Sequence, residues 1–184
     1  LSHLEKTLEL DPNESEAYYY TGMVLLSLHR YKEAIKPLIK ACKLSKSNAF
    51  AFYALGKACV GSGELDKALE CYRRGLEINP RDTKTRSALG QAYFQKNELT
   101  LAKRQFEKVL EENPREREAR YFLGMCQFRL HEYENAIESY HQAANANPNS
   151  AKGAFTKGAI LSSKNRYQEA LNHFREASNY RPEN

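Results

Sequence analysis

Residues 83–116, TKTRSALGQAYFQKNELTLAKRQFEKVLEENPRE, decide how the rest of this 184-residue chain is interpreted. Small and apolar residues recur at helical spacing in the first half, at Leu89, Gly90 and Tyr93. A second stripe in the second half consists of Leu99, Ala102, Phe106 and Val109, and Pro114 ends it. The stretch therefore predicts two amphipathic helices joined by a short polar turn.

The same pattern returns along the chain at a fixed interval, the separation of Gly22 from Gly56, which we call the repeat interval. The glycine recurs at Gly22, Gly56, Gly90, Gly124 and Gly158, and an alanine recurs at Ala34, Ala68, Ala102, Ala136 and Ala170. Self-similarity at this period indicates a helical repeat array, and the pattern Leu-Gly, Tyr, Ala, aromatic, Ala and Pro resembles the tetratricopeptide repeat. The resemblance covers the whole chain. It implies an all-α, right-handed α-solenoid of antiparallel helix pairs, in which the first helix of each pair lines a concave face.

The repeat frame divides residues 1–184 into one array. Residues 1–14 align with the second helix of a truncated repeat, so the chain looks like a piece of a longer solenoid. Five full repeats are expected at 15–48, 49–82, 83–116, 117–150 and 151–184. Each repeat is expected to bury its apolar face against its neighbours, because a repeat array has no single core.

Composition and charge favour a folded protein without a nucleic-acid stripe. Hydrophobic residues make up 41% of the chain and charged residues 28%, and no apolar run approaches the ~20 residues of a membrane span. Net charge is −3 for 1–14 and then +4, 0, +2, −1 and +3 for the five repeats. Because the sign varies and no continuous basic face with interleaved aromatics appears, nucleic acid is a poor candidate partner.

The four cysteines suggest neither a metal site nor a disulfide framework. Cys42, Cys59, Cys71 and Cys126 fall at different repeat positions and form no C-x-x-C pair. Small buried apolar thiols are the favoured interpretation. Reduced cysteines weakly indicate a cytosolic or nuclear compartment, and a cytoplasmic location is expected.

Catalytic chemistry is not expected. The five histidines have no metal-ligand spacing, and the chain lacks H-E-x-x-H, G-x-S-x-G and P-loop motifs. Acidic residues near 111–118 are interpreted as a surface ion-pair network with neighbouring arginines, because paired catalytic carboxylates need a shielded cleft. No cofactor, no metal and no enzymatic activity are therefore predicted.

The groove positions are the informative ones. In tetratricopeptide repeats the second, fifth, ninth, twelfth and thirteenth positions face the concave side, and here they carry many rings. The predicted partner-binding residues are Tyr19, Phe50, Tyr53, Lys84, Phe94, Tyr121, Phe128, Arg129, Lys152 and Phe155. Exposed aromatic surface usually marks an interaction site. The alternative for Phe94 and Phe128 is packing between adjacent first helices.

The resemblance also argues against the best-known ligand of the family, the acidic carboxyl terminus of cytosolic chaperones. Its binding positions in three successive repeats correspond here to Tyr19 and Met23, then Ala54, then Lys84 and Ala88. Of these, only Lys84 matches the residue that the family uses. The chaperone tail is therefore not the expected partner.

The function predicted is a protein-interaction scaffold or adaptor that holds a peptide or helix of a partner in the concave groove. The alternatives are an array that assembles with its own copies and the targeting domain of a larger enzyme. Self-association is expected through the uncapped ends, because repeat arrays need polar capping helices. The residues involved would be Leu1, Leu4, Leu8, Leu171, Phe174 and Tyr180.

Overall fold

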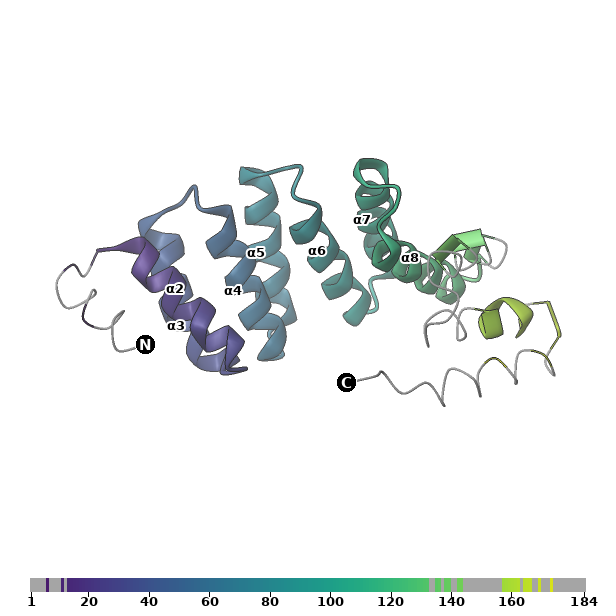
Figure 1. Ribbon diagram of the computed structural model, residues 1–184, viewed down its shortest axis with the longest axis horizontal. Helices are drawn as coiled ribbons and strands as arrows, with labels where there is room; N and C mark the ends of the chain where they lie inside the picture. The colour runs from purple at the N-terminus through teal and green to yellow at the C-terminus, as the bar shows by residue number, and fades with distance from the viewer. Residues whose placement is uncertain are drawn as a thin grey trace. The chain divides into compact units, whose positions relative to one another are not determined.

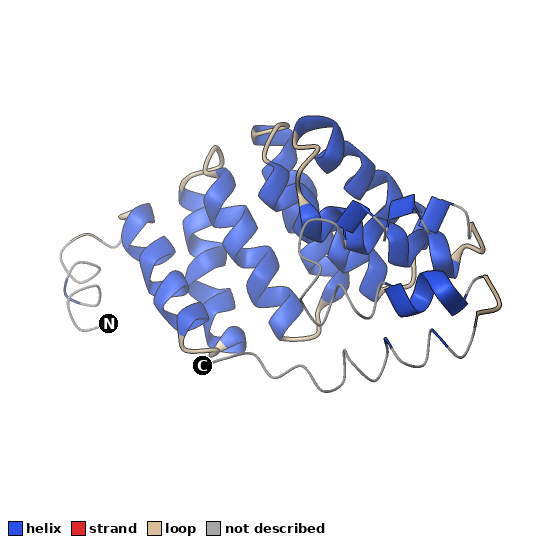
Figure 2. Cartoon of the chain, turned by 45° about the vertical axis from the view of Figure 1, so that its right-hand side comes forward, coloured by secondary structure: helices blue, strands red, loops and turns tan. Residues whose placement is uncertain are grey.

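The computed structural model confirms the all-α class. It describes residues 13–132 without a break, together with 6, 11, 135–136, 138–139, 142–143, 157–162, 164–166, 169 and 173. These residues form helices and connecting turns, and none of them is in a strand (Figure 2). The statements below concern this part of the chain.

The helices form two alternating series along the chain, and Figure 1 labels them in chain order. The first helices of the pairs, called leading helices here, are α2 (Ser15–Ser27), α4 (Ala49–Gly61), α6 (Thr83–Gln95) and α8 (Arg117–Arg129). The second, or trailing, helices are α3 (Tyr31–Leu44), α5 (Leu65–Ile78) and α7 (Leu99–Glu112). Every leading helix starts one repeat interval after the previous one, and so does every trailing helix.

The chain divides into two compact units, Leu1–Lys96 and Asn97–Asn184. The helices α2 to α6 belong to the first unit, and α7 and α8 belong to the second. The division falls between the two helices of the expected repeat 83–116. The partition into one truncated and five full repeats stays a prediction.

In the first unit α4 is the central helix. It packs against the leading helices α2 and α6 on its sides and against the trailing helices α3 and α5. The leading helices α2, α4 and α6 therefore form one face of this unit, which we call the leading-helix face. The helices α3 and α5 form the opposite, trailing-helix face.

Glycine allows the two helices of a pair to approach closely. A Cβ atom on Gly22 would lie 2.3 Å from Cγ of Leu38, and one on Gly56 would lie 2.4 Å from Cε1 of Tyr72. Leu38 and Tyr72 are both buried and occupy the same position of successive trailing helices. The contact between glycine and a large apolar side chain thus repeats from pair to pair.

The turn between the two helices of a pair has a left-handed residue at a fixed position. Its φ is 56° at His29, 80° at Gly63, 61° at Asn97, 63° at His131 and 57° at Asn165. Each of these residues stands one repeat interval after the previous one. Glycine and asparagine adopt a positive φ more readily than most residues. Histidine is also enriched in this conformation, and His29 and His131 occupy the turn position in their repeats.

Side-chain caps start the leading helices of the first unit. The side chains of Glu14, Asn48 and Asp82 accept hydrogen bonds from the backbone N–H groups of Glu16, Ala51 and Lys84, each at 3.1 Å. Such caps satisfy amide groups that have no partner in the first helical turn. The cap position also recurs at the repeat interval, which fixes the entry of the chain into each leading helix.

The second unit has its own apolar contacts. Phe106 of α7 is buried and stacks on Phe122 of α8, with ring centroids 5.3 Å apart and planes 10° from parallel. Ala136 and Ile160 form a further small core. Between two half-buried side chains of this unit, Nζ of Lys103 lies 2.6 Å from a carboxylate oxygen of Glu132.

Two sequence expectations concern membranes and chain ends. Among the helices that the structure describes, none combines the length and apolar character that crossing a bilayer requires.

The residues expected to make the ends associate lie outside the described residues. They are Leu1, Leu4, Leu8, Leu171, Phe174 and Tyr180. Self-association therefore stays a prediction.

Candidate functional site

The predicted binding residues that the structure describes all lie on leading helices. Tyr19 is on α2, Phe50 and Tyr53 are on α4, Lys84 and Phe94 are on α6, and Tyr121, Phe128 and Arg129 are on α8. Lys152 and Phe155 lie outside the described residues. The first five belong to the first unit and the other three to the second.

A cavity of about 230 Å³ opens on the leading-helix face of the first unit. It lies mainly between α4 and α6, with the start of α3 and a ring of α5 closing it. The lining residues are Tyr31, Tyr53, Lys57, Val60, Gly61, Tyr72, Ala88, Gln91, Ala92 and Gln95. The small side chain of Ala88 on α6 leaves part of this space, whereas the Tyr31 ring packs directly against Gly61.

Tyr53 lies between a buried ring and a lysine side chain. Its centroid lies 6.0 Å from that of the buried Tyr72, and Nζ of Lys84 lies 5.1 Å from the centroid of Tyr53. A cation over a ring face is attracted by the quadrupole of the ring. Burial, and then the charge of Asp82, raise the pKa of the Tyr53 hydroxyl. The hydroxyl therefore stays protonated at neutral pH and can donate a hydrogen bond.

The structure adds polar groups to the site that the sequence analysis did not select. Lys57, Gln91 and Gln95 line the cavity together with Tyr53. They occupy the ninth and thirteenth repeat positions, which the resemblance assigns to the concave side. Repeat position alone therefore indicates these residues, although none of them is aromatic.

The other predicted residues of the first unit are not part of this cavity. Tyr19 lies against Tyr20, with ring centroids 5.2 Å apart, and burial followed by the Tyr20 charge raises its pKa. Phe50 is the most exposed large hydrophobic residue among those described, with 67% of its surface accessible. Phe94 is half-buried on α6. Of the predicted residues only Tyr53 therefore lines the cavity, and Nζ of Lys84 lies over the Tyr53 ring outside the lining.

In the second unit Tyr121 has a structural role beside any binding role. It is half-buried, packs against the Ala136 and Ile160 core and meets Phe122 edge to face at 5.8 Å. Burial raises the pKa of its hydroxyl. Phe128, in contrast, keeps 44% of its surface accessible. Of the predicted rings on α8, Phe128 is thus the one that solvent reaches more readily.

The cysteines do not form a metal site in the described part of the chain, where no group of three or more candidate ligands converges. Burial raises the pKa of Cys42 to about 11 and that of Cys126 to about 12. These two thiols are protonated at neutral pH and behave as small apolar groups. The thiols of Cys59 on α4 and Cys71 on α5 influence each other, so that the pKa of Cys71 is raised and that of Cys59 is lowered, a pairing that the sequence spacing did not predict.

Most of the family profiles that match this chain describe the same type of repeat. Profiles described as tetratricopeptide repeat match residues 87–151 and 151–184, and one described as TPR repeat matches 56–97. A profile described as anaphase-promoting complex, cyclosome, subunit 3 matches residues 1–75. None of the curated proteins compared with the chain matches it.

Solved structures of repeat proteins resemble the chain over most of its length. MamA 41-end from Desulfovibrio magneticus RS-1 is 21% identical with a TM-score of 0.82, and the match covers 89% of this chain and 93% of that one. YrrB, described as a TPR protein with an unusual peptide-binding site, is 21% identical with a TM-score of 0.78, covering 95% and 90%. PilF of Pseudomonas aeruginosa is 20% identical with a TM-score of 0.78, covering 92% and 78%. These likenesses confirm the predicted solenoid class.

Proposed function

We propose that this chain, which belongs to the tetratricopeptide repeat family, is a protein-interaction module that binds a segment of a partner on the leading-helix face of its first unit. The observation that carries the proposal is the cavity between α4 and α6. It is open to solvent, aromatic on one wall and polar on the other. The described residues offer no arrangement that favours an enzymatic role.

The wall of the cavity fits an apolar or aromatic anchor residue. Tyr31 and Tyr53 present ring surface, and Val60 and Ala88 add aliphatic surface. Aromatic rings supply large contact area at a small cost in rotamer freedom, and a tyrosine hydroxyl can bond a ligand backbone. One anchor side chain inserted beside Tyr53 would fill this cavity.

The polar residues define the rest of the ligand. The side-chain amides of Gln91 and Gln95 stand one helical turn apart on α6 and can both donate to and accept from an extended backbone. Lys57 and Lys84 are exposed and give this region a positive charge. The favoured ligand is therefore an extended segment with an aromatic or aliphatic anchor next to an acidic residue, and the charges should act on binding mainly through the association rate.

The remaining predicted groove residues do not line the cavity, and we propose that they make further contacts with the partner. Tyr19 and Phe50 lie on leading helices of the same unit and offer further ring surface. For the second unit, Tyr121, Phe128 and Arg129 are proposed to bind partner side chains, and Lys152 and Phe155 stay predictions. A self-assembling array and the targeting domain of a larger enzyme remain the alternative functions.

Charge reversal on the leading-helix face should weaken binding. A peptide is first selected from a phage-displayed random library on the wild-type chain, and its Kd is measured by fluorescence anisotropy. We expect the double variant Lys57→Glu with Lys84→Glu to raise this Kd at least about tenfold, because both lysines face the ligand.

The matched control is Lys32→Glu with Lys36→Glu. These lysines are exposed on α3, line none of the cavities described and change the net charge by the same amount. The Kd should rise less than about threefold for this control. If both double variants weaken binding equally, net charge rather than the leading-helix face governs binding, and the proposal is wrong.

A further inference from the structure

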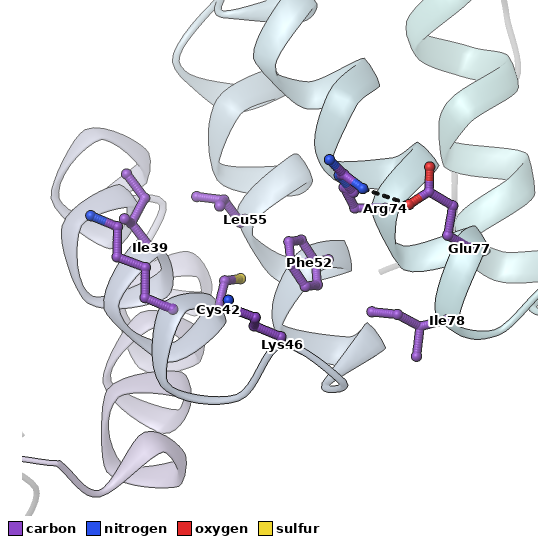
Figure 3. Close-up of a pocket in the computed structure, with 9 residues that line it drawn as sticks. Ile39, Cys42, Lys46, Phe52, Leu55, Arg74, Glu77 and Ile78 are labelled. Carbon is purple, nitrogen blue, oxygen red and sulfur yellow. Dashed lines mark hydrogen bonds and ion pairs between the residues drawn. The ribbon is translucent and has the colours of Figure 1, made fainter.

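The trailing-helix face of the first unit holds an apolar groove that the proposed function does not use. Two cavities, of about 480 and 330 Å³, lie between α3 and α5 and share Ile39, Phe52, Leu55 and Arg74 as lining residues. Because they share these residues, they form one continuous groove. Figure 3 shows Phe52 and Leu55 of α4 between the side chains of α3 and those of α5.

The groove exposes aliphatic side chains on both of its edges. Ile39 of α3 keeps 38% of its surface accessible, and Ile78 of α5 keeps 37%. Leu55 and Cys42 lie deeper and are buried. Exposed apolar surface that is continuous across two helices usually marks an interaction site on a soluble domain.

Charge along the groove is asymmetric. Between residues 31 and 46, five lysines oppose a single glutamate, Glu33, and this glutamate is bound by Arg30. Lys43 and Lys46 line the groove on the α3 side, and neither makes an ion pair with any residue that the structure describes. On the α5 side, Arg74 is paired with Glu77 at 2.9 Å. The α3 edge is therefore positive and the α5 edge is neutral.

We propose that this groove binds an amphipathic helix that carries apolar side chains on one face and acidic side chains along one border of that face. A helix laid between α3 and α5 would place its apolar side chains on Phe52, Leu55 and the two isoleucines. Its carboxylates would face Lys43 and Lys46. This is the helix-in-groove mode, in which side chains one turn apart serve as anchors.

The dimensions of the groove fit such a ligand. The helices α3 and α5 have 14 residues each, which corresponds to a length of about 21 Å at 1.5 Å per residue. A ligand helix of about four turns spans this length. A strongly basic helix would be rejected, since it would bring like charges onto the α3 edge.

The surface is separate from the one proposed for an extended segment. Cavity residues on the leading-helix face come mainly from α4 and α6, whereas groove residues come mainly from α3 and α5. The α4 residues of the two sites are also different. Those that line the cavity are Tyr53, Lys57, Val60 and Gly61, and those that line the groove are Phe52, Leu55 and Cys59. The two sites can therefore be tested independently.

The test uses a synthetic four-turn helical peptide with leucines on one face and glutamates along its border. We expect the wild-type chain to bind it with micromolar Kd by fluorescence anisotropy. The double variant Lys43→Glu with Lys46→Glu should raise the Kd at least about tenfold. A peptide with lysines in place of the glutamates should not bind.

Two further variants keep the test decisive. Ile39→Glu with Ile78→Glu should abolish binding, and circular dichroism should show unchanged helix content because both side chains are already partly exposed. Lys57→Glu with Lys84→Glu should leave the Kd unchanged, because those lysines are on the other face. Failure of the acidic peptide to bind the wild-type chain overturns the proposal. Sedimentation that shows a dimer of the wild-type chain and a monomer of the Ile39→Glu, Ile78→Glu variant also overturns it, because a second copy would then cover the groove.

Discussion

Replacing Gly56 by Ala should lower the free energy of unfolding by about 2 kcal/mol, because the added methyl group overpacks the contact between two helices. The new Cβ would lie 2.4 Å from Cε1 and 2.7 Å from Cδ1 of Tyr72. Since the Tyr72 ring is only 2% exposed and packs on Tyr53, it has little room to move. The gain of about 1 kcal/mol that alanine brings to a helix interior offsets part of this cost.

Two other glycines of the first unit serve as controls for the Gly56 variant. In Gly75→Ala the nearest atom to the new Cβ, Cγ2 of Thr85, is 3.4 Å away, so helix propensity should keep stability equal to wild type or raise it by up to about 1 kcal/mol. In Gly63→Ala nothing lies within 4 Å, but φ is 80°, so a backbone cost of about 1 kcal/mol is expected. Urea unfolding followed by circular dichroism ranks the three variants. A Gly56 variant as stable as the Gly75 variant would contradict the close helix contact.

Replacing Phe106 by Ala should destabilise α7 and α8 by about 3 to 5 kcal/mol, because it empties a buried position. The side chain is 1% exposed and stacks on Phe122, so truncation removes both its burial and its ring contact. Repeat arrays can unfold in parts, so amide hydrogen exchange of α7 and α8 is the suitable measurement. Exchange of these amides should accelerate by at least about a hundredfold.

The control for Phe106→Ala is Phe128→Ala on the neighbouring helix. Because Phe128 keeps 44% of its surface accessible, its truncation should change exchange in α8 by less than about tenfold. Equal acceleration by both variants would show that burial at the Phe106 position does not stabilise the pair.

Much of the fold follows from the spacing of a few residues. Glycine and alanine recurring at the repeat interval predict the helix pairs, and α2, α4, α6 and α8 begin at that interval. The turn position occupied by His29, Gly63, Asn97 and His131 has the same interval, but its left-handed φ was not predicted. Glycine or asparagine in every repeat would have indicated a positive φ at this position, but two of the repeats have a histidine there.

The site could be predicted only in part, because side-chain packing determines which residues meet. Repeat position alone identifies Tyr53 and Lys84 as groove residues. It does not reveal that Tyr72 and Lys84 both contact the Tyr53 ring, since Tyr72 comes from a trailing helix. The apolar groove on the other face depends on which residues α3 and α5 leave uncovered, notably Ile39 and Ile78. The exposure of these two side chains cannot be predicted from the spacing of residues in the sequence.

Site-specific photo-cross-linking tests most directly whether the leading-helix face of the first unit binds a partner segment. The photoreactive residue p-benzoylphenylalanine is placed at Gln95, which is exposed and lines the cavity, and in a matched variant at Lys36 on α3. Each variant is irradiated with the peptide selected on the wild-type chain, and the cross-linked fraction is measured by mass spectrometry. The account predicts at least about tenfold more cross-linked peptide at position 95 than at position 36. Equal yields, or a higher yield at position 36, would contradict it.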